Sequence, residues 1–313
     1  MRGKNPNSTD PAAITRAAST QTYYTILFLA DRGWAGNAFR AYGYFRWLDD
    51  QLDNDGLKRQ TRLELVKRQN QIMRSTYTNY FDGPVQAEER ILVDLIHSDT
   101  EENSGLKQYI DSMMAVMEFD AQRRGKSISA GELDNYSIQL SRAVTEAMHY
   151  FIGHDKKSPN SETRYQAVIG AHITHMLRDT LDDIRSGYYN IPREYLETHS
   201  ITPRDINSEP YRKWVEERVT QARACFEAGR GYVAKVESIR FRMAALAYMK
   251  RFEKILSLIE MDHFVLRPNY ENIKPAREGK RFKWAWFGSP EFSSTKISSS
   301  PLRSVYNQVV EKL

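Results

Sequence analysis

Two pairs of aspartates are the residues of this chain whose type and spacing could do chemistry. The first pair is Asp49 and Asp53, and the second is Asp179 and Asp183. Side chains four residues apart share one face of a helix, with Cβ atoms about 5–6 Å apart, so each pair can bind a common cation. Each pair also follows a strongly apolar stretch, where carboxylates are rare unless they are paired or bind a metal.

If the two segments face each other, four carboxylates converge. Such an all-oxygen set suits Mg²⁺, with Mn²⁺ as an alternative, because Mg²⁺ takes a few carboxylates together with waters and phosphate oxygens. A diphosphate is the matching partner, since bridging metal ions let its charge lie beside the acids. Arg46 and Arg178 precede the two pairs and can add charge-assisted hydrogen bonds.

A competing interpretation is that each segment is a solvated helix end with local Arg–Asp pairs. Chance alone supplies about one such spacing in a chain of this composition. The presence of two pairs, each with a nearby arginine and an apolar lead-in, favours the metal site.

Helices must position these acids. Proline is absent from 12–83, 85–158 and 211–267, and within these stretches apolar residues recur at helical spacing, as in Leu63, Val66, Ile72 and Met73. Strand-like alternation bounded by Asn-Gly or Asp-Gly turns is scarce. The pattern predicts an all-α, single-domain antiparallel helix bundle with a central cavity. We expect helices near residues 19–30, 34–53, 57–79, 85–97, 104–124, 129–153, 161–187, 209–234 and 237–265.

Composition limits the remaining functions. The chain has 313 residues, of which 41% are hydrophobic and 27% charged, which is typical of a globular protein. The net charge of +5 comes from scattered basic residues, so we expect no nucleic-acid partner. No apolar run reaches the roughly 20 residues of a membrane span. The polar first residues lack a signal-peptide pattern, and the single Cys225 forms no internal disulfide, so we expect a cytoplasmic protein.

Three regions follow from these patterns. Residues 1–17 form an N-terminal extension, 18–270 the helical domain and 271–313 a C-terminal extension rich in basic and aromatic residues. Within the last, Lys280, Trp284 and Trp286 are typical of a segment that contacts a membrane surface. A surface tail or a packed lid is the alternative. The oligomeric state stays open.

Over about residues 18–270 the chain resembles the squalene and phytoene synthases, head-to-head members of the isoprenoid synthase fold. Residues 42–53, which read YGYFRWLDDQLD, are similar to the first aspartate-rich motif of that family. Residues 177–192, which read LRDTLDDIRSGYYNIP, resemble its second motif. Thr20-Gln-Thr-Tyr-Tyr24 is similar to an early family segment, and Tyr136 falls where the family has a tyrosine that contacts diphosphate.

The resemblance implies a prenyltransferase. An allylic prenyl diphosphate, farnesyl or geranylgeranyl, would ionise with Mg²⁺ and join head-to-head to a second one through a cyclopropyl intermediate, with release of diphosphate. The implied catalytic residues are Asp49, Asp53, Asp179, Asp183, Arg46 and Arg178, the four acids of this set being the metal ligands. The implied substrate-binding residues are Tyr23, Tyr42, Tyr136, His172, His175, Asp50 and Asp182. Tyr23, Tyr24, Phe45 and Trp47 are candidates to line an apolar cavity, although aromatic residues at helical spacing are more often core.

The chain departs from the family in three places. His172 and His175 stand where the family has Gln and Asn, the segment 136–146 contains no glycine, and Phe252 stands near where the family tends to have Tyr. The histidines could bind diphosphate when protonated, act as a base, ligate a different metal or cap polar space beside the site. These changes keep two alternatives open: a single-substrate terpene cyclase, or prenyl transfer to a non-isoprenoid acceptor. A non-catalytic homologue is a third.

Overall fold

The computed structural model describes residues 10–54, 56–80, 83–268 and 270, and these contain helices and no strand. The helices are α1 (Pro11–Ala18), α2 (Thr20–Leu29), α3 (Ala35–Leu52), α4 (Arg59–Tyr77), α5 (Ala87–His97), α6 (Gly105–Arg123), α7 (Ala130–Phe151), α8 (Gln166–Ser186), α9 (Arg193–Thr198), α10 (Glu209–Val233) and α11 (Ile239–Met261). The all-α prediction is confirmed. The region 271–313, and with it the basic and aromatic segment, lies outside the described residues.

All nine expected helices form, and the structure adds two. α1 begins at Pro11, and the side chain of Asp10 caps it by accepting from the Ala12 N–H at 3.1 Å. A capping Asp followed by Pro is a recognised helix start, so this signal was available in the sequence. α9 has only six residues and begins after Pro192. The helix expected over 161–187 begins at Gln166, because residues 161–165 form turns.

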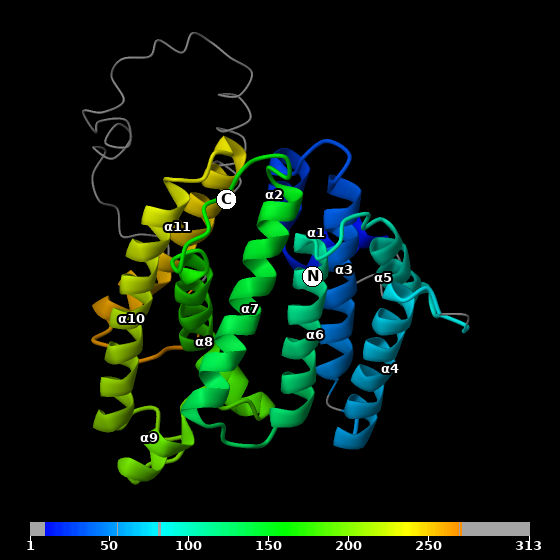
Figure 1. Ribbon diagram of the computed structural model, residues 1–313. Coiled ribbons are helices and arrows are strands. Elements are labelled where there is room, and N and C mark those ends of the chain that lie inside the picture. Colours follow the sequence, from blue (N-terminus) through cyan, green and yellow to red (C-terminus); the bar gives the residue numbers. More distant parts are fainter. Residues whose placement is uncertain (1–9, 55, 81–82, 269, 271–313) are drawn as a thin grey trace, which may run out of the picture. The chain divides into compact units, whose positions relative to one another are not determined.

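The bundle packs mainly through neighbouring helices. Figure 1 shows α6 and α7 side by side, with α4 and α5 to one side of them and α10 and α11 to the other. α8 packs against α7, α10 and α11. Small residues let α8 and α10 approach closely: a Cβ on Gly229 would lie 2.7 Å from the backbone N of Ala167. This contact fixes α8, the helix that carries the second acid pair.

The end of α8 redirects the chain toward the acids. Gly187 adopts a left-handed conformation with φ of +83°, which a glycine tolerates and which terminates the helix. Its carbonyl accepts from the Gly125 N–H at 2.7 Å, and the next N–H, that of Tyr188, bonds to the carbonyl of Asp183 at 2.7 Å. Tyr188 and Asn190 are thereby held beside the ends of α6 and α8.

In the described part of the chain, no helix is both long and apolar enough to cross a membrane.

Candidate active site

The two acid pairs lie near the C-terminal ends of α3 and α8. Asp49 is in the last turn of α3 and Asp53 follows as its cap, while Asp179 and Asp183 are in the last two turns of α8. The hydroxyl of Tyr188, which follows α8, donates to the Asp53 Oδ1 at 3.4 Å. The bundle therefore brings the ends of these two helices, and with them both motifs, to one site.

Close to both pairs lies a fifth acid that the motifs did not reveal. Asp120, at the end of α6, is close enough to raise the pKa values of Asp49, Asp53 and Asp183. It also accepts a hydrogen bond at 3.0 Å from the hydroxyl of Tyr136 on α7. Tyr136, predicted from the family resemblance, is thus placed at the site through Asp120.

A buried arginine links this acid to the second motif. Arg123 is only 8% exposed, and its Nε donates to Asp120 Oδ1 at 2.6 Å. A terminal nitrogen of the same guanidinium donates to Asn190 Oδ1 at 2.8 Å, and Asn190 Nδ2 donates to Asp183 Oδ2 at 2.7 Å. The guanidinium also lies over the rings of Tyr136 and Tyr188, at 4.8 and 4.9 Å from their centroids. A signal for this residue existed in the i, i+3 pair Asp120 and Arg123, but such pairs are common on helices.

Burial and mutual repulsion disfavour the ionised forms of several of these acids. Burial, followed by the charge of Asp53, raises the pKa of Asp49 to about 7. Burial and then Asp179 raise the pKa of Asp183 to about 7, and desolvation and then Asp120 raise the pKa of Asp53. Ionised together, these acids repel one another in a poorly solvated place, and a bound cation would remove that penalty.

Paired carboxylates are donors of the kind that Mg²⁺ accepts. Within the described ranges, no three groups among carboxylates, imidazoles and thiols lie close enough to hold one ion between them. Acids arranged as pairs suit an ion that takes its remaining ligands from water and phosphate oxygens rather than from a closed protein cage. Asp49, Asp53, Asp179 and Asp183 are the residues that would hold it.

The two predicted arginines pair with acids of their own motifs. Arg46 bonds to Asp49 at 3.1 Å and also to Asp50, while Arg178 makes two bonds to Asp179 at 2.6 and 2.7 Å. Burial opposes ionisation of Asp179, but the bonds from Arg178 and His175 prevail and hold its pKa well below the usual value. A diphosphate at this site would meet guanidinium groups already in place.

The remaining acids of the motifs face outward. Asp50 has a side chain 55% exposed, and Asp182 is 68% exposed and bonded to Arg185 at 2.8 Å. Neighbouring residues on a helix point about 100° apart, so one acid of each Asp-Asp dipeptide, Asp50 in the first and Asp182 in the second, leaves the face that carries the other. Their role in substrate binding stays a prediction.

The two histidines have different surroundings. His175 is about half exposed, and its Nε2 lies 2.9 Å from Asp179 Oδ2. His172 is 5% exposed, and burial lowers its pKa to about 3. A neutral ring would meet a diphosphate as a hydrogen-bonding group rather than as a cation, and the role of His172 in substrate binding stays a prediction.

The tyrosines near α2 lie beside the first motif. Tyr42 is partly buried, which raises its pKa, and it is close to Arg46 and to the Thr22 hydroxyl at the start of α2. Tyr23 packs against Phe39 with 5.4 Å between ring centroids. Phe45 is buried against Tyr109 and belongs to the core between α3 and α6.

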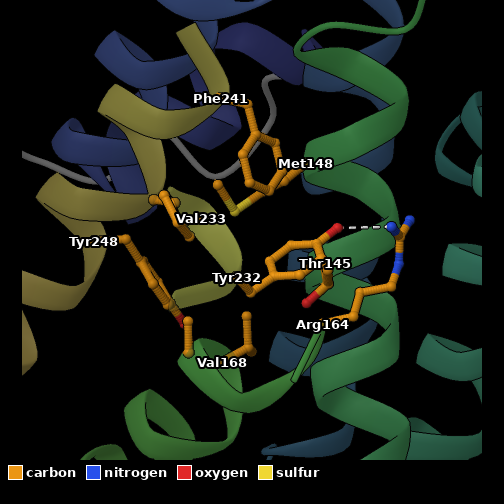
Figure 2. A pocket seen from close by; sticks show the side chains of 10 residues that line it. Thr145, Met148, Arg164, Val168, Tyr232, Val233, Phe241 and Tyr248 are labelled. Carbon is orange, nitrogen blue, oxygen red and sulfur yellow. Dashed lines mark hydrogen bonds between the residues drawn. The ribbon is translucent and has the colours of Figure 1, made fainter. Parts of the chain in front are cut away.

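An apolar pocket lies toward the other end of α8. Its walls come from α7, α8, α10 and α11 and include Met148, Val168, Val233, Phe241 and Tyr248. Figure 2 shows the hydroxyl of Tyr232 hydrogen-bonded to Arg164 at its edge, at 2.8 Å. Val168 and Asp179 are eleven residues apart, about three turns, and thus on one face of α8. The face with the acids therefore continues into apolar space.

A helical bundle with paired acids at one end and an apolar pocket further along the same helix has the architecture of an isoprenoid synthase. The chain belongs to the squalene/phytoene synthase family, whose model matches residues 15–278. This confirms the family that the motifs indicated, and the chain is a prenyltransferase by membership.

Solved structures agree on the fold. The chain is similar to squalene synthase HpnC from Alicyclobacillus acidocaldarius, with 17% identity and a TM-score of 0.61 over 82% of this chain and 94% of that one. It is also similar to a dehydrosqualene synthase in complex with a ligand, with 14% identity and a TM-score of 0.64 over 96% and 94% of the two chains. A comparison with curated proteins gave no match.

Proposed function

We propose that this protein joins two allylic prenyl diphosphates, farnesyl or geranylgeranyl, head-to-head in a Mg²⁺-dependent reaction that releases diphosphate. The observation that carries the proposal is the convergence of Asp49 and Asp53 with Asp183, through Asp120, Arg123 and Asn190, in a site where burial and mutual repulsion raise the pKa values of the acids.

The acids and arginines would act on the diphosphate. Bound Mg²⁺ would neutralise the charge that develops on the leaving diphosphate. Arg46 and Arg178, already oriented by Asp49 and Asp179, add donors that strengthen as that charge grows. Arg123 holds Asp120 and Asn190 in place, so that the acids keep their positions as the ligand binds.

The apolar end of the site protects the cation. Once diphosphate leaves, the allylic cation must be kept from water until the second chain reacts. Val168, Phe241 and Tyr248 line a small apolar pocket of about 10 Å³, which would have to widen to take the isoprenoid tail.

The test uses purified protein, Mg²⁺ and either farnesyl or geranylgeranyl diphosphate as the sole substrate. Diphosphate release is measured together with the extracted product by mass spectrometry, and Mn²⁺ replaces Mg²⁺ in a parallel series. A C30 or C40 product supports the proposal. A product of one prenyl unit would indicate a cyclase instead, and a substrate mixture that stays unchanged in every arm would indicate a non-catalytic homologue.

A very apolar product would leave the protein for a membrane rather than for water. We therefore keep peripheral membrane contact as part of the proposal. Co-sedimentation with vesicles containing anionic lipid, compared between the full chain and a chain ending at Pro268, tests it. Equal binding of the two forms would contradict a role for the C-terminal extension.

A further inference from the structure

His172 is a buried polar side chain whose ring nitrogens lack a partner. It is 5% exposed, and neither Nδ1 nor Nε2 makes a hydrogen bond. Buried polar groups are nearly always hydrogen-bonded, because leaving them unsatisfied is costly. An unsatisfied imidazole inside an enzyme therefore points to a missing partner, such as a ligand.

The place of His172 on α8 tells which part of a ligand it meets. It lies four residues after Val168 of the pocket wall and seven before Asp179, on the same helix face. At 1.5 Å per residue these separations are about 6 Å and about 10 Å along the axis. The ring of Tyr136, whose hydroxyl binds Asp120, packs edge-on against it at 5.0 Å. His172 thus stands between the diphosphate end and the apolar end.

His175 and His149, on the same helix and on the neighbouring α7, have partners that His172 lacks. His175 faces Asp179 at 2.9 Å, and His149 meets the Tyr232 hydroxyl at 2.8 Å while it stacks on Phe241. The Thr145 hydroxyl, which belongs to the pocket wall and also lacks a partner, is a much weaker base than an imidazole. His172 therefore supplies a basic lone pair that no group in the described part of the chain occupies.

Burial keeps that lone pair available. Burial first, and then the nearby His175 and Arg123, disfavour the imidazolium and lower the pKa of His172 to about 3. The ring is neutral at any ordinary pH, with one donor and one free acceptor. A weak base suffices here, because a C–H bond next to a carbocation is strongly acidic.

We propose that His172 accepts the proton that ends the reaction. The inference rests on the proposed head-to-head coupling. After the last diphosphate leaves, the C–H bond next to the cationic carbon breaks and its electron pair becomes a new C=C bond. The proton forms an N–H bond with the ring of His172, so the positive charge moves from carbon to imidazolium. No electrons enter or leave, and the step consumes no reductant; the ring returns the proton to water when the product departs.

Proton transfer to His172 predicts which class of hydrocarbon is formed. A cation quenched by proton loss yields a hydrocarbon with an additional double bond at the joined carbons, and it forms from prenyl diphosphate and Mg²⁺ alone. A cation quenched by hydride would need a reductant and would lack that bond.

The experiment compares wild type, His172→Phe and His172→Gln in reactions without any reductant, using ordinary substrate and substrate deuterated at C1. We expect the wild type to form the additional double bond, with slower termination for deuterated substrate. In His172→Phe the ratio of this hydrocarbon to coupled diphosphate intermediate or alcohol should fall by about 100-fold or more, the usual scale for loss of a general base. His172→Gln keeps hydrogen bonding but has no basic nitrogen, so in this variant the ratio should fall by a similar factor. His199→Phe, a histidine stacked on Tyr195 near α9, is the matched control and should leave the ratio unchanged.

The results distinguish an error in the role of His172 from an error in the proposed function. Wild-type ratios in both variants would overturn the role of His172, as would a wild type that couples two substrates but makes hydrocarbon only when a reductant is added. In both cases coupling and diphosphate release persist, so the proposed function survives. Absence of diphosphate release from the wild type would overturn both. Circular dichroism establishes whether the variants fold. If His172→Phe does not fold, His172→Gln and the wild-type reaction with deuterated substrate still test the role of His172.

Discussion

At the scale of single residues, Asp49 is a carboxylate whose ionised form the fold disfavours. Its carboxyl has a pKa raised to about 7 by burial and by Asp53, so its ionised form is unfavourable until a cation binds. Arg46 offsets only part of this, since it also bonds to Asp50. Residues kept for function in this way are often ones that stability alone would not retain.

The variant Asp49→Asn tests this conflict. It removes the charge while keeping the shape, so we expect the metal-free protein to melt at an equal or higher temperature than wild type. Mg²⁺-dependent diphosphate release should fall by about 100-fold or more, the scale seen when a transition-state donor or charge is removed. Asp94→Asn, an exposed acid on α5, is the control for both measurements. A lower melting temperature together with normal turnover would show that Asp49 is structural.

At the scale of elements, the contact between α8 and α10 positions the second acid pair. A Cβ on Gly229 would lie 2.7–2.8 Å from backbone atoms of Ala167, so Gly229→Ala must push the helices apart. We expect a loss of about 1–3 kcal/mol in the free energy of unfolding, as for other overpacked sites, and lower activity. Gly231→Ala on the same helix meets nothing within 4 Å and should gain about 0.5–1 kcal/mol from helix propensity. Urea denaturation measures both, and equal effects would contradict the close approach.

Glu89 connects α5 to α4 and makes stability depend on pH. Burial disfavours its charge, but bonds from Arg68 (2.7 and 2.8 Å), from Gln69 (2.8 Å) and from the Gln86 N–H (2.9 Å) outweigh that and lower its pKa to about 2. A lowered carboxyl pKa stabilises the fold above the unfolded value near 4.5, and this contribution is lost as the pH falls toward 2.

We therefore expect Glu89→Gln to lower the free energy of unfolding by about 2 kcal/mol at pH 7, less than the full shift because Arg68 is half exposed. The difference from wild type should shrink between pH 5 and pH 3 in urea titrations. Glu64→Gln, exposed on α4, is the control. A difference that stays constant over this range would mean that the ion pair does not carry the effect.

At the scale of the whole molecule, the sequence predicted the bundle better than the site. Long proline-free stretches with helical periodicity locate nine helices. The periodicity is visible in the sequence because each helix buries one of its faces in the core. α9 escaped notice because six residues cannot show a period. The acid motifs were visible as repeats, whereas Asp120, Arg123 and Asn190 each come from a different segment and meet only in the folded chain. The contrast between buried His172 and exposed His175 likewise depends on which neighbours cover α8.

The acids of α3 and α8 belong to distant parts of the chain, so a ligand that bridges them should stabilise the whole fold. We expect Mg²⁺ with inorganic diphosphate to raise the melting temperature of the wild type more than either alone. Mg²⁺ neutralises the carboxylates that would repel diphosphate, and diphosphate supplies oxygen ligands that complete the coordination of Mg²⁺. At a ligand concentration about 100 times the dissociation constant, the free energy of unfolding rises by about 2.7 kcal/mol. The melting temperature then rises by about 5 °C or more for a domain of this size. Asp49→Asn and Asp183→Asn, one on each helix, should each abolish the joint shift, whereas Asp94→Asn should keep it. If either site variant retained the full shift, its helix would not contribute to the bound complex, and the two motifs would not act as one site.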